Sequence, residues 1–398
     1  MHNEARSRLA IIASHPIQYQ DPFFRRLARE DDVDLTVFYC SRHGLDTFLD
    51  EDMATTLRWD VDLLHGYRSH FLRNFARNVY GGYTRLINPG IVPAIVRGHF
   101  DAVIFMLGWG SISALLGIVA CRLTRTPFFL YGDSSFPPAE DSFRARVRAG
   151  FIRTIFALAT GFMTSGKLNA DYYEHYGADP KTFFLLPWAV DNERFADASR
   201  MSEEERNELR ASYGIAHDAI IFLFSAKLVP RKDPMTLLRA YAKMAARDRC
   251  VVAFMGDGVL REPLERFVRE HDLDRGVRFL GFVNQRDIPR HYAMSDVFVL
   301  PSVYEPRGAV INEAMACGLP VIVTDRCGSI GDIVQENDNA FIYPAGDADA
   351  LAALLDRIAT DDALRKHMSE RSRAIIDDWT FDRGVQGVKS MLRWVKSR

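Results

Sequence analysis

The stretch from Pro301 to Asp325 limits the possible folds of this chain more than any other part of the sequence. It reads as the end of a strand, a loop, a short helix, a Gly-Leu-Pro turn and a second strand. Gly308 stands where the helix should begin, and Ala309 and Val310 follow it. A helix that starts among small residues offers free backbone N–H groups and the positive end of its dipole to an anion. The stretch therefore predicts a phosphate-binding helix start inside a strand–helix–strand unit.

Two glutamates lie on either side of this predicted phosphate site. Glu305 is in the loop and Glu313 is in the helix, with seven residues between them. Each carboxylate can accept hydrogen bonds, for example from sugar hydroxyls. A lone pair of glutamates is more often a pair of surface carboxylates on an ordinary strand–helix unit. Here, however, the residues around the pair favour the binding role.

The rest of the chain alternates short apolar runs with helical stretches. The expected strands cover residues 9–14, 33–39, 102–107, 127–131, 220–224, 251–255, 277–283 and 296–300. One expected helix begins near residue 23, another begins at the acidic residues 203–205 and runs to residue 213, and others cover residues 113–123, 235–246, 348–360 and 383–397. This alternation predicts parallel sheets with right-handed crossovers, in which ligands bind beyond the carboxyl ends of the strands.

In the second half of the chain, basic residues and glycine turns follow the expected strands. Lys227 and Lys232 come after the strand at 220–224, where two ammonium groups can hold a diphosphate. Isolated lysines are usually plain surface residues. The position of these two at the carboxyl end of an expected strand favours a binding role instead. Further candidate binding residues at the strand ends are Gly256, Asp257 and Gly258 after one strand, and Gly281 and Val283 for a nucleobase edge after the next.

In the first half, three segments follow expected strands and are candidates for the side of the site that binds an acceptor molecule. They cover residues 15–20, 108–110 and 132–135. His15 is a candidate base or hydrogen-bond donor, although single histidines near strand ends are more often structural. Asp133 is a weaker candidate in the third segment.

The pattern Pro-Ser-x-x-Glu-Pro-x-Gly-x-x-x-x-Glu-Ala-Met-Ala-Cys-Gly-x-Pro-Val-Ile resembles the donor-site signature of family-four retaining glycosyltransferases, which have the GT-B fold. Residues 225–234 resemble the family's Gly-Arg-Leu-Val-x-x-Lys-Gly segment, and residues 256–260 its Gly-Asp-Gly-x-Leu element. The opening His-Pro-Ile-Gln-Tyr-Gln loop resembles that of a bacterial subgroup.

The resemblance implies two Rossmann-like parallel-sheet α/β domains that face each other across a cleft. Residues 1–187 would bind the acceptor, residues 188–380 would bind the nucleotide-sugar donor, and the last helix, about 381–398, would return to the first domain. It also implies transfer with retention of anomeric configuration, with no cofactor and no metal. The diphosphate would contact Lys227 and Lys232, while Glu313 would bind the ribose and Glu305 the donor sugar.

Three positions depart from the family pattern. Arg307 replaces a common phenylalanine, so it changes the packing against the sugar or adds a positive charge beside the phosphates. Lys227 replaces an arginine and lacks its bidentate fork, so we expect looser leaving-group binding. Gly132 and Asp133 stand where many members have a histidine, which puts that histidine's role in doubt.

Composition narrows the class of partner. The net charge of −2 over 398 residues argues against a surface that binds nucleic acid. The five cysteines form no Cys-x-x-Cys pair, which argues against a zinc site and a disulfide framework and favours a reducing, cytoplasmic setting. The start of the chain lacks the long apolar core of a signal peptide, and no apolar run reaches the roughly 20 residues of a membrane span.

Two acid-free basic stretches, residues 67–100 and 142–167, raise the question of membrane contact. A basic amphipathic helix can lie on an anionic membrane surface, and the family often acts on lipid-linked or envelope-bound glycan acceptors. A core-facing helix with a solvated outer face explains the same pattern slightly better.

Three other functions remain open. A metal-dependent transferase is one alternative, because Asp-x-Asp pairs occur at 32/34, 60/62, 272/274 and 347/349. None of these pairs follows a strand in a suitable loop except weakly, so chance is the better explanation for them. A sugar-nucleotide epimerase or hydrolase could use the same fold. A catalytically silent sugar-nucleotide binding protein is the third alternative.

Overall fold

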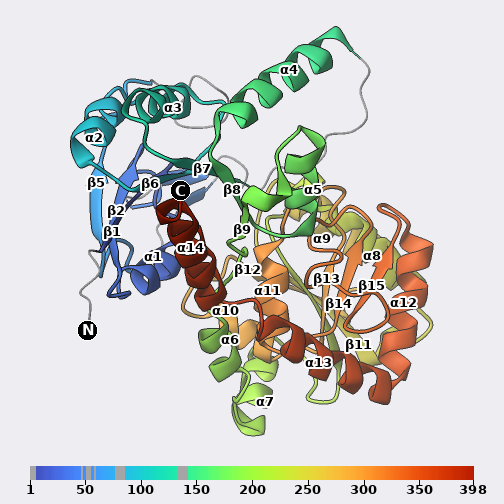
Figure 1. The fold of residues 1–398 in the computed structure, drawn as a ribbon. Coiled ribbons are helices and arrows are strands. Elements are labelled where there is room, and N and C mark those ends of the chain that lie inside the picture. The colour runs from blue at the N-terminus through green and yellow to red at the C-terminus, as the bar shows by residue number, and fades with distance from the viewer. Residues whose placement is uncertain (1–5, 46–47, 51–54, 58–59, 77–85, 133–141) are drawn as a thin grey trace. The chain divides into compact units, whose positions relative to one another are not determined.

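The protein forms two compact units in a computed structural model that describes residues 6–45, 48–50, 55–57, 60–76, 86–132 and 142–398 (Figure 1). The first unit comprises residues 1–48, 61–188 and 381–398, and the second comprises residues 49–60 and 189–380. The predicted boundary after residue 187 lies one residue before the boundary between the units. The sequence did not indicate that residues 49–60, which contribute to the small β3–β4 sheet, would group with the second unit.

The first unit contains a seven-stranded parallel sheet in the order β5-β2-β1-β6-β7-β8-β9. Its strands are β1 (Ser7–Ala13), β2 (Val33–Tyr39), β5 (Arg68–Phe71), β6 (Ala102–Met106), β7 (Phe128–Tyr131), β8 (Gly161–Thr164) and β9 (Phe183–Leu185). Its helices are α1 (Asp21–Leu27), α2 (Ile91–Gly98), α3 (Ile112–Thr124), α4 (Phe143–Leu158), α5 (Lys167–His175) and η1 (Pro180–Thr182). The central strands are almost wholly buried and apolar, as a parallel sheet covered on both faces requires.

The last helix, α14 (Phe381–Lys396), also belongs to the first unit. It packs against α1 and β9, where Val385, Val388 and Met391 are buried. Ion pairs of Arg26 with Asp382 and of Lys389 with both Glu30 and Asp32 join α14 to the start of the chain.

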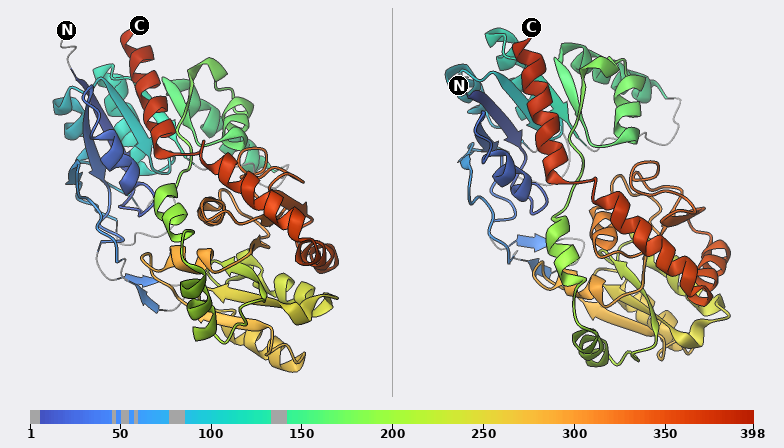
Figure 2. Two further views of the ribbon diagram at one scale, coloured as in Figure 1. Left: turned by 90° about the horizontal axis from the view of Figure 1, so that it is seen from below. Right: turned by 60° about the horizontal axis from the view of Figure 1, so that its bottom comes forward.

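The second unit contains a six-stranded parallel sheet in the order β12-β11-β10-β13-β14-β15. Figure 2 shows this unit, coloured from green through yellow and orange to red along the chain, in two further views. Its strands are β10 (Ile220–Ser225), β11 (Cys250–Met255), β12 (Val277–Gly281), β13 (Val297–Leu300), β14 (Val321–Thr324) and β15 (Ala340–Tyr343). Its helices are α6 (Asn192–Ala198), α7 (Glu203–Ser212), η2 (Pro230–Lys232), α8 (Pro234–Lys243), η3 (Arg247–Arg249), α9 (Arg261–Glu270), α10 (Ile288–Ala293), α11 (Ala309–Ala316), α12 (Ala348–Thr360) and α13 (Asp362–Ile376). The small sheet consists of β3 (Phe48–Asp50) and β4 (Thr55–Leu57).

Both large sheets reverse their strand order at one internal position. In the first sheet the reversal lies between β1 and β6, and in the second between β10 and β13. Loops that follow the two strands at such a position diverge and leave room for a ligand. The fold therefore points to the loops after β1, β6, β10 and β13. No helix in the described part of the chain is long and apolar enough to cross a membrane.

Candidate active site at the carboxyl edge of the second sheet

The loops after β10 and β13 bring Lys232 and Glu305 together. β10 and β13 are paired neighbours, so residues 73 positions apart meet at one edge of the sheet. The Lys232 ammonium forms an ion pair with Oε2 of Glu305, and the two side chains are only 12% and 7% exposed. Burial lowers the pKa of Lys232, while the attraction of Glu305 opposes that shift. The site thus holds a desolvated positive charge next to a carboxylate.

Glu305 also contacts the start of α11. Its Oε1 accepts a hydrogen bond from the backbone N–H of Gly308, at 3.1 Å. Gly308 has a φ of +67°, a left-handed conformation that suits glycine, and it forms the N-cap of α11. Among the described residues, no acceptor takes a hydrogen bond from the next two backbone N–H groups, those of Ala309 and Val310. The predicted helix start at Gly308 is thus present, and these two N–H groups are free to donate to an anion.

Glu313 is buried on α11 with a side-chain partner. It is 1% exposed, and its Oε2 accepts a hydrogen bond of 2.9 Å from the hydroxyl of Tyr292, a fully buried residue of α10. Since Glu305 is also buried, at 6% exposure, the alternative that the two glutamates are ordinary surface carboxylates is wrong.

The glycine turn after β11 supports the loop that carries Lys227. A Cβ atom at Gly256 would overlap the carbonyl oxygen of Ala226, and one at Gly258 would lie 2.6 Å from that of Leu228. Leu228 N–H donates to the carbonyl oxygen of Asp257, at 2.9 Å. The predicted binding residues Gly256, Asp257 and Gly258 therefore pack directly against the β10 loop.

Asp257, Gly281 and Val283, the other predicted binding residues, lie at the same edge of the sheet. The Asp257 carboxylate accepts from the Gly258 N–H at 2.8 Å and lies 3.2 Å from Arg261. Gly281 ends β12 with a φ of +74°, and its carbonyl oxygen accepts from Gly256 N–H, at 2.9 Å. Val283 is two residues further on and is half-buried.

Arg307 is buried and faces a carboxylate. Its side chain is 7% exposed, and Nη1 lies 3.9 Å from Oδ2 of Asp332. The hydroxyl of Ser329 donates a hydrogen bond to the Arg307 carbonyl oxygen. The charge of Arg307 is thus partly compensated by Asp332.

In the first unit, His15 follows β1 at the reversal of the sheet. Burial, and secondarily the nearby His43, lower the pKa of His15 to about 4, so the ring is neutral at pH 7. Its Nδ1 lies 3.0 Å from the Ser14 hydroxyl. The Gly108–Gly110 segment follows β6, the strand next to β1. Asp133 lies outside the described residues.

Sequence reasoning missed two residues that hold the site. Tyr292 lies on a different helix from Glu313, and no spacing rule connects them. Gly328 donates its N–H to the Glu305 carbonyl oxygen at 2.7 Å, and a Cβ atom there would overlap the carbonyl oxygen of Pro306. Gly328 is the glycine of the Cys-Gly-Ser segment after β14, and a glycine in such a loop could have indicated a close approach of two backbone segments.

Solved structures confirm the predicted fold. HepE of Anabaena, in complex with UDP, aligns with a TM-score of 0.75 at 18% identity over 97% of this chain and 99% of that chain. Sucrose-phosphate synthase of Thermosynechococcus elongatus aligns with a TM-score of 0.72 at 20% identity over 98% and 100%. The two units are thus the two parallel-sheet α/β domains of the GT-B fold.

Sequence relatives match about half of the chain. An uncharacterized glycosyltransferase of Methanocaldococcus jannaschii is 33% identical over 50% of this chain and 49% of its own length. A D-inositol 3-phosphate glycosyltransferase of Geodermatophilus obscurus is 35% identical over 46% and 42%. The matched regions thus span about half the length of these relatives. Residues 205–375, which hold every predicted site residue of the second unit, match the family model "Glycosyl transferases group 1".

Proposed function

We propose that the protein is a retaining glycosyltransferase, which moves a sugar from a nucleotide-sugar donor to an acceptor hydroxyl in glycan synthesis. The observation that carries the proposal is the buried Lys232–Glu305 pair beside the start of α11. Its residues lie inside the segment that matches the glycosyl transferase model. The UDP in the HepE structure supports a nucleoside diphosphate as the leaving group.

Sugar transfer needs stabilisation of the leaving diphosphate as negative charge accumulates on it. Lys232, Lys227 and the N–H groups at the start of α11 supply that stabilisation without a metal. A diphosphate in the site replaces Glu305 as the partner of Lys232, and this frees the Glu305 carboxylate for the donor sugar's hydroxyls. Glu313, held by Tyr292, binds the ribose hydroxyls.

The acceptor is a glycan or a lipid-linked sugar, as expected in envelope polysaccharide or glycolipid synthesis. The loops after β1 and β6, with His15 and Gly108–Gly110, are its proposed contacts. A neutral His15 can accept a proton or donate a hydrogen bond to an acceptor hydroxyl, but it supplies no charge at pH 7.

We also propose that α4 binds the inner face of a membrane peripherally. Phe143, Val147 and Phe151 are 82%, 56% and 37% exposed and recur every four residues, so they form one stripe. Arginines 144, 146 and 148 lie beside it in the same exposed turns. Further along the helix, Ile152, Ile155 and Phe156 face the core, so a core-facing role explains only the second half of α4.

A two-step experiment tests the proposed activity. A panel of nucleotide sugars is screened by thermal shift, and a donor at about 100 times its Kd should stabilise the fold by roughly 2.7 kcal/mol. Nucleotide release is then measured in chelator with and without glycan acceptors, and NMR reads the anomeric configuration of the product. Release only with acceptor, and retained configuration, support the proposal. Rapid turnover without acceptor, or binding without any turnover, contradicts it.

A further inference from the structure

The second unit contains a cavity of about 470 Å³ at the opposite end of its sheet from the candidate active site. Its wall includes Asp296, just before β13, and Leu319, just before β14. Glu305 follows β13, so the cavity and the active site lie at opposite ends of the same parallel strands. The remaining wall comes from α13, from the segment between α6 and α7, from the first turns of α7, and from the C-terminal ends of α10 and α11. The volume suits a small molecule.

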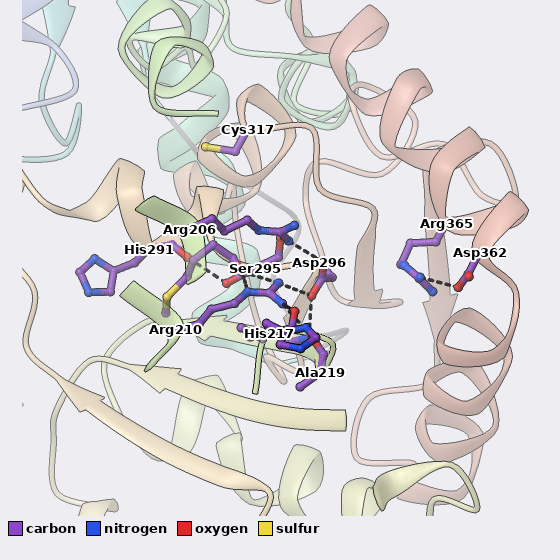
Figure 3. A network of polar contacts seen from close by, with 12 residues as sticks. Arg206, Arg210, His217, Ala219, His291, Ser295, Asp296, Cys317, Asp362 and Arg365 are labelled. Atoms are coloured by element: carbon purple, nitrogen blue, oxygen red, sulfur yellow. Dashed lines mark hydrogen bonds and ion pairs between the residues drawn. The ribbon is translucent and has the colours of Figure 1, made fainter. Parts of the chain in front are cut away.

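Positive charge is in excess at the floor of the cavity and directly beneath it, because Arg206 lines the cavity and Arg210 is buried behind Asp296. Asp296 accepts hydrogen bonds from Arg206 at 2.7 Å and from Arg210 at 2.9 Å, and also from the backbone N–H of Ile221 (Figure 3). One carboxylate therefore stands against two guanidinium groups. Nε of Arg206 is buried and donates to no acceptor in the described part of the chain.

The rim of the cavity is also basic. Lys366 is exposed on α13 and forms no ion pair with any described residue. Arg365 pairs with the exposed Asp362 at 2.5 Å. Arg373 donates to the Cys317 carbonyl oxygen at 3.3 Å, which places a cation at the C-terminus of α11. The lining holds four cationic side chains, Arg206, Arg365, Lys366 and Arg373, against the three carboxylates Glu203, Asp296 and Asp362.

We propose that this cavity binds a small phosphate monoester. Guanidinium groups match the oxygens of a phosphate, and the lining serines provide partners for a hydroxylated remainder. Ser295 and Ser199 already donate their hydroxyl protons to backbone carbonyls, so their oxygens can accept hydrogen bonds from such a ligand. The site is separate from the donor site, because the two lie at opposite ends of α11, a helix about 12 Å long.

Calorimetry with simple probes tests the proposal without donor, acceptor or transferase activity. Inorganic phosphate and glycerol 3-phosphate are titrated, with glycerol as the neutral probe. The protein carries Lys232→Ala, which suppresses anion binding at the donor site. Lys366→Glu is then added, and Arg269→Glu is the matched control, since Arg269 is an exposed cation on α9 outside the cavity.

The proposal predicts that glycerol 3-phosphate binds and that Lys366→Glu weakens its affinity by about tenfold while Arg269→Glu does not. Tighter binding of glycerol 3-phosphate than of phosphate supports an organic ligand, and equal binding supports free phosphate in the same site. Equal effects of the two variants, equal binding of glycerol, or no binding of either anion at millimolar concentration would overturn it. Unchanged melting temperatures of both variants show that the fold is intact.

Discussion

Lys232 and Glu305, 73 residues apart in the sequence, form a buried ion pair where the loops after β10 and β13 meet. With its other carboxylate oxygen, Glu305 accepts a hydrogen bond from the N–H of Gly308, the N-cap of α11. One carboxylate therefore links the proposed diphosphate ligand Lys232 to the proposed phosphate-binding helix start.

Loss of the Glu305 carboxylate should reduce activity while the fold persists. Glu305→Gln keeps the side-chain shape but removes the charge that faces Lys232 and the donor sugar. We expect kcat to fall by about 10²–10³. Glu265→Gln, which alters a half-buried pair with Arg261 on α9, is the control and should keep normal kcat. A kcat for Glu305→Gln within twofold of the unmodified protein would exclude Glu305 from the reaction.

Gly308→Ala should impair donor binding beyond its effect on stability. A Cβ atom there would lie 2.9 Å from Cδ1 of Ile311 and 3.1 Å from Cγ of Glu305. Gly346→Ala is the matched control, because Gly346 also has a positive φ, +82°, but a Cβ atom there meets nothing within 4 Å. Both variants should lose about 1–2 kcal/mol to backbone strain. Only Gly308→Ala should raise the donor KM, and equal KM values would show that the helix start is not a ligand site.

Tyr292→Phe should weaken donor binding through Glu313. The substitution removes the hydroxyl that donates to Oε2 of Glu313, and loss of a buried hydrogen bond costs about 1–3 kcal/mol of stability. Tyr241→Phe is the control, since its hydroxyl donates to the Cys250 carbonyl oxygen and does not contact Glu313. Denaturant unfolding should show a loss for both variants. The donor KM should rise only for Tyr292→Phe; a normal KM would separate Glu313 from donor binding.

The depressed pKa of His15 predicts an acid-labile fold. The unfolded chain binds a proton near pH 6.5, whereas the folded protein binds it near pH 4. The free energy of unfolding should therefore decrease as the pH falls from 6.5 to 4, by up to about 3 kcal/mol from this residue. Urea midpoints across this range should fall less steeply for His15→Asn than for the exposed-site control His65→Asn. Parallel curves would contradict the burial of His15.

The stripe on α4 should determine any membrane binding. Phe143→Ser with Val147→Ser removes two exposed apolar side chains, so flotation with anionic vesicles should be lost. Val259→Ser changes another exposed valine, at 59% exposure in the second unit, and should float normally. Absence of flotation for the unmodified protein would rule out membrane contact.

Much of the fold was predictable because its signals are local. The predicted strand 33–39 is β2, and the expected helix start at Gly308 is the N-cap of α11. The sequence did not indicate the short strands β5 and β8. β5 reads Arg-Ser-His-Phe and has only one apolar residue, and β8 lies within the stretch that was interpreted as helical. Residues 142–167, interpreted as a basic helical stretch, contain both α4 and β8.

The site was predictable in outline, because parallel strands place their carboxyl ends at one edge. The direct contact of Lys232 with Glu305 was not, since it depends on the pairing of β10 with β13. The same holds for the Tyr292–Glu313 and Arg307–Asp332 contacts, which join separate elements. Long-range contacts of this kind follow from strand order and side-chain packing, which local patterns do not contain.

The affinity of Lys232→Ala for the nucleoside diphosphate of the donor, measured by calorimetry beside Lys232→Arg, tests the central claim most directly. Loss of a charge-assisted hydrogen bond is worth about 1.5–3 kcal/mol, so Lys232→Ala should bind at least about tenfold more weakly, and Lys232→Arg should recover part of that loss. An unchanged Kd for Lys232→Ala would contradict the assignment of this edge of the sheet as the diphosphate site.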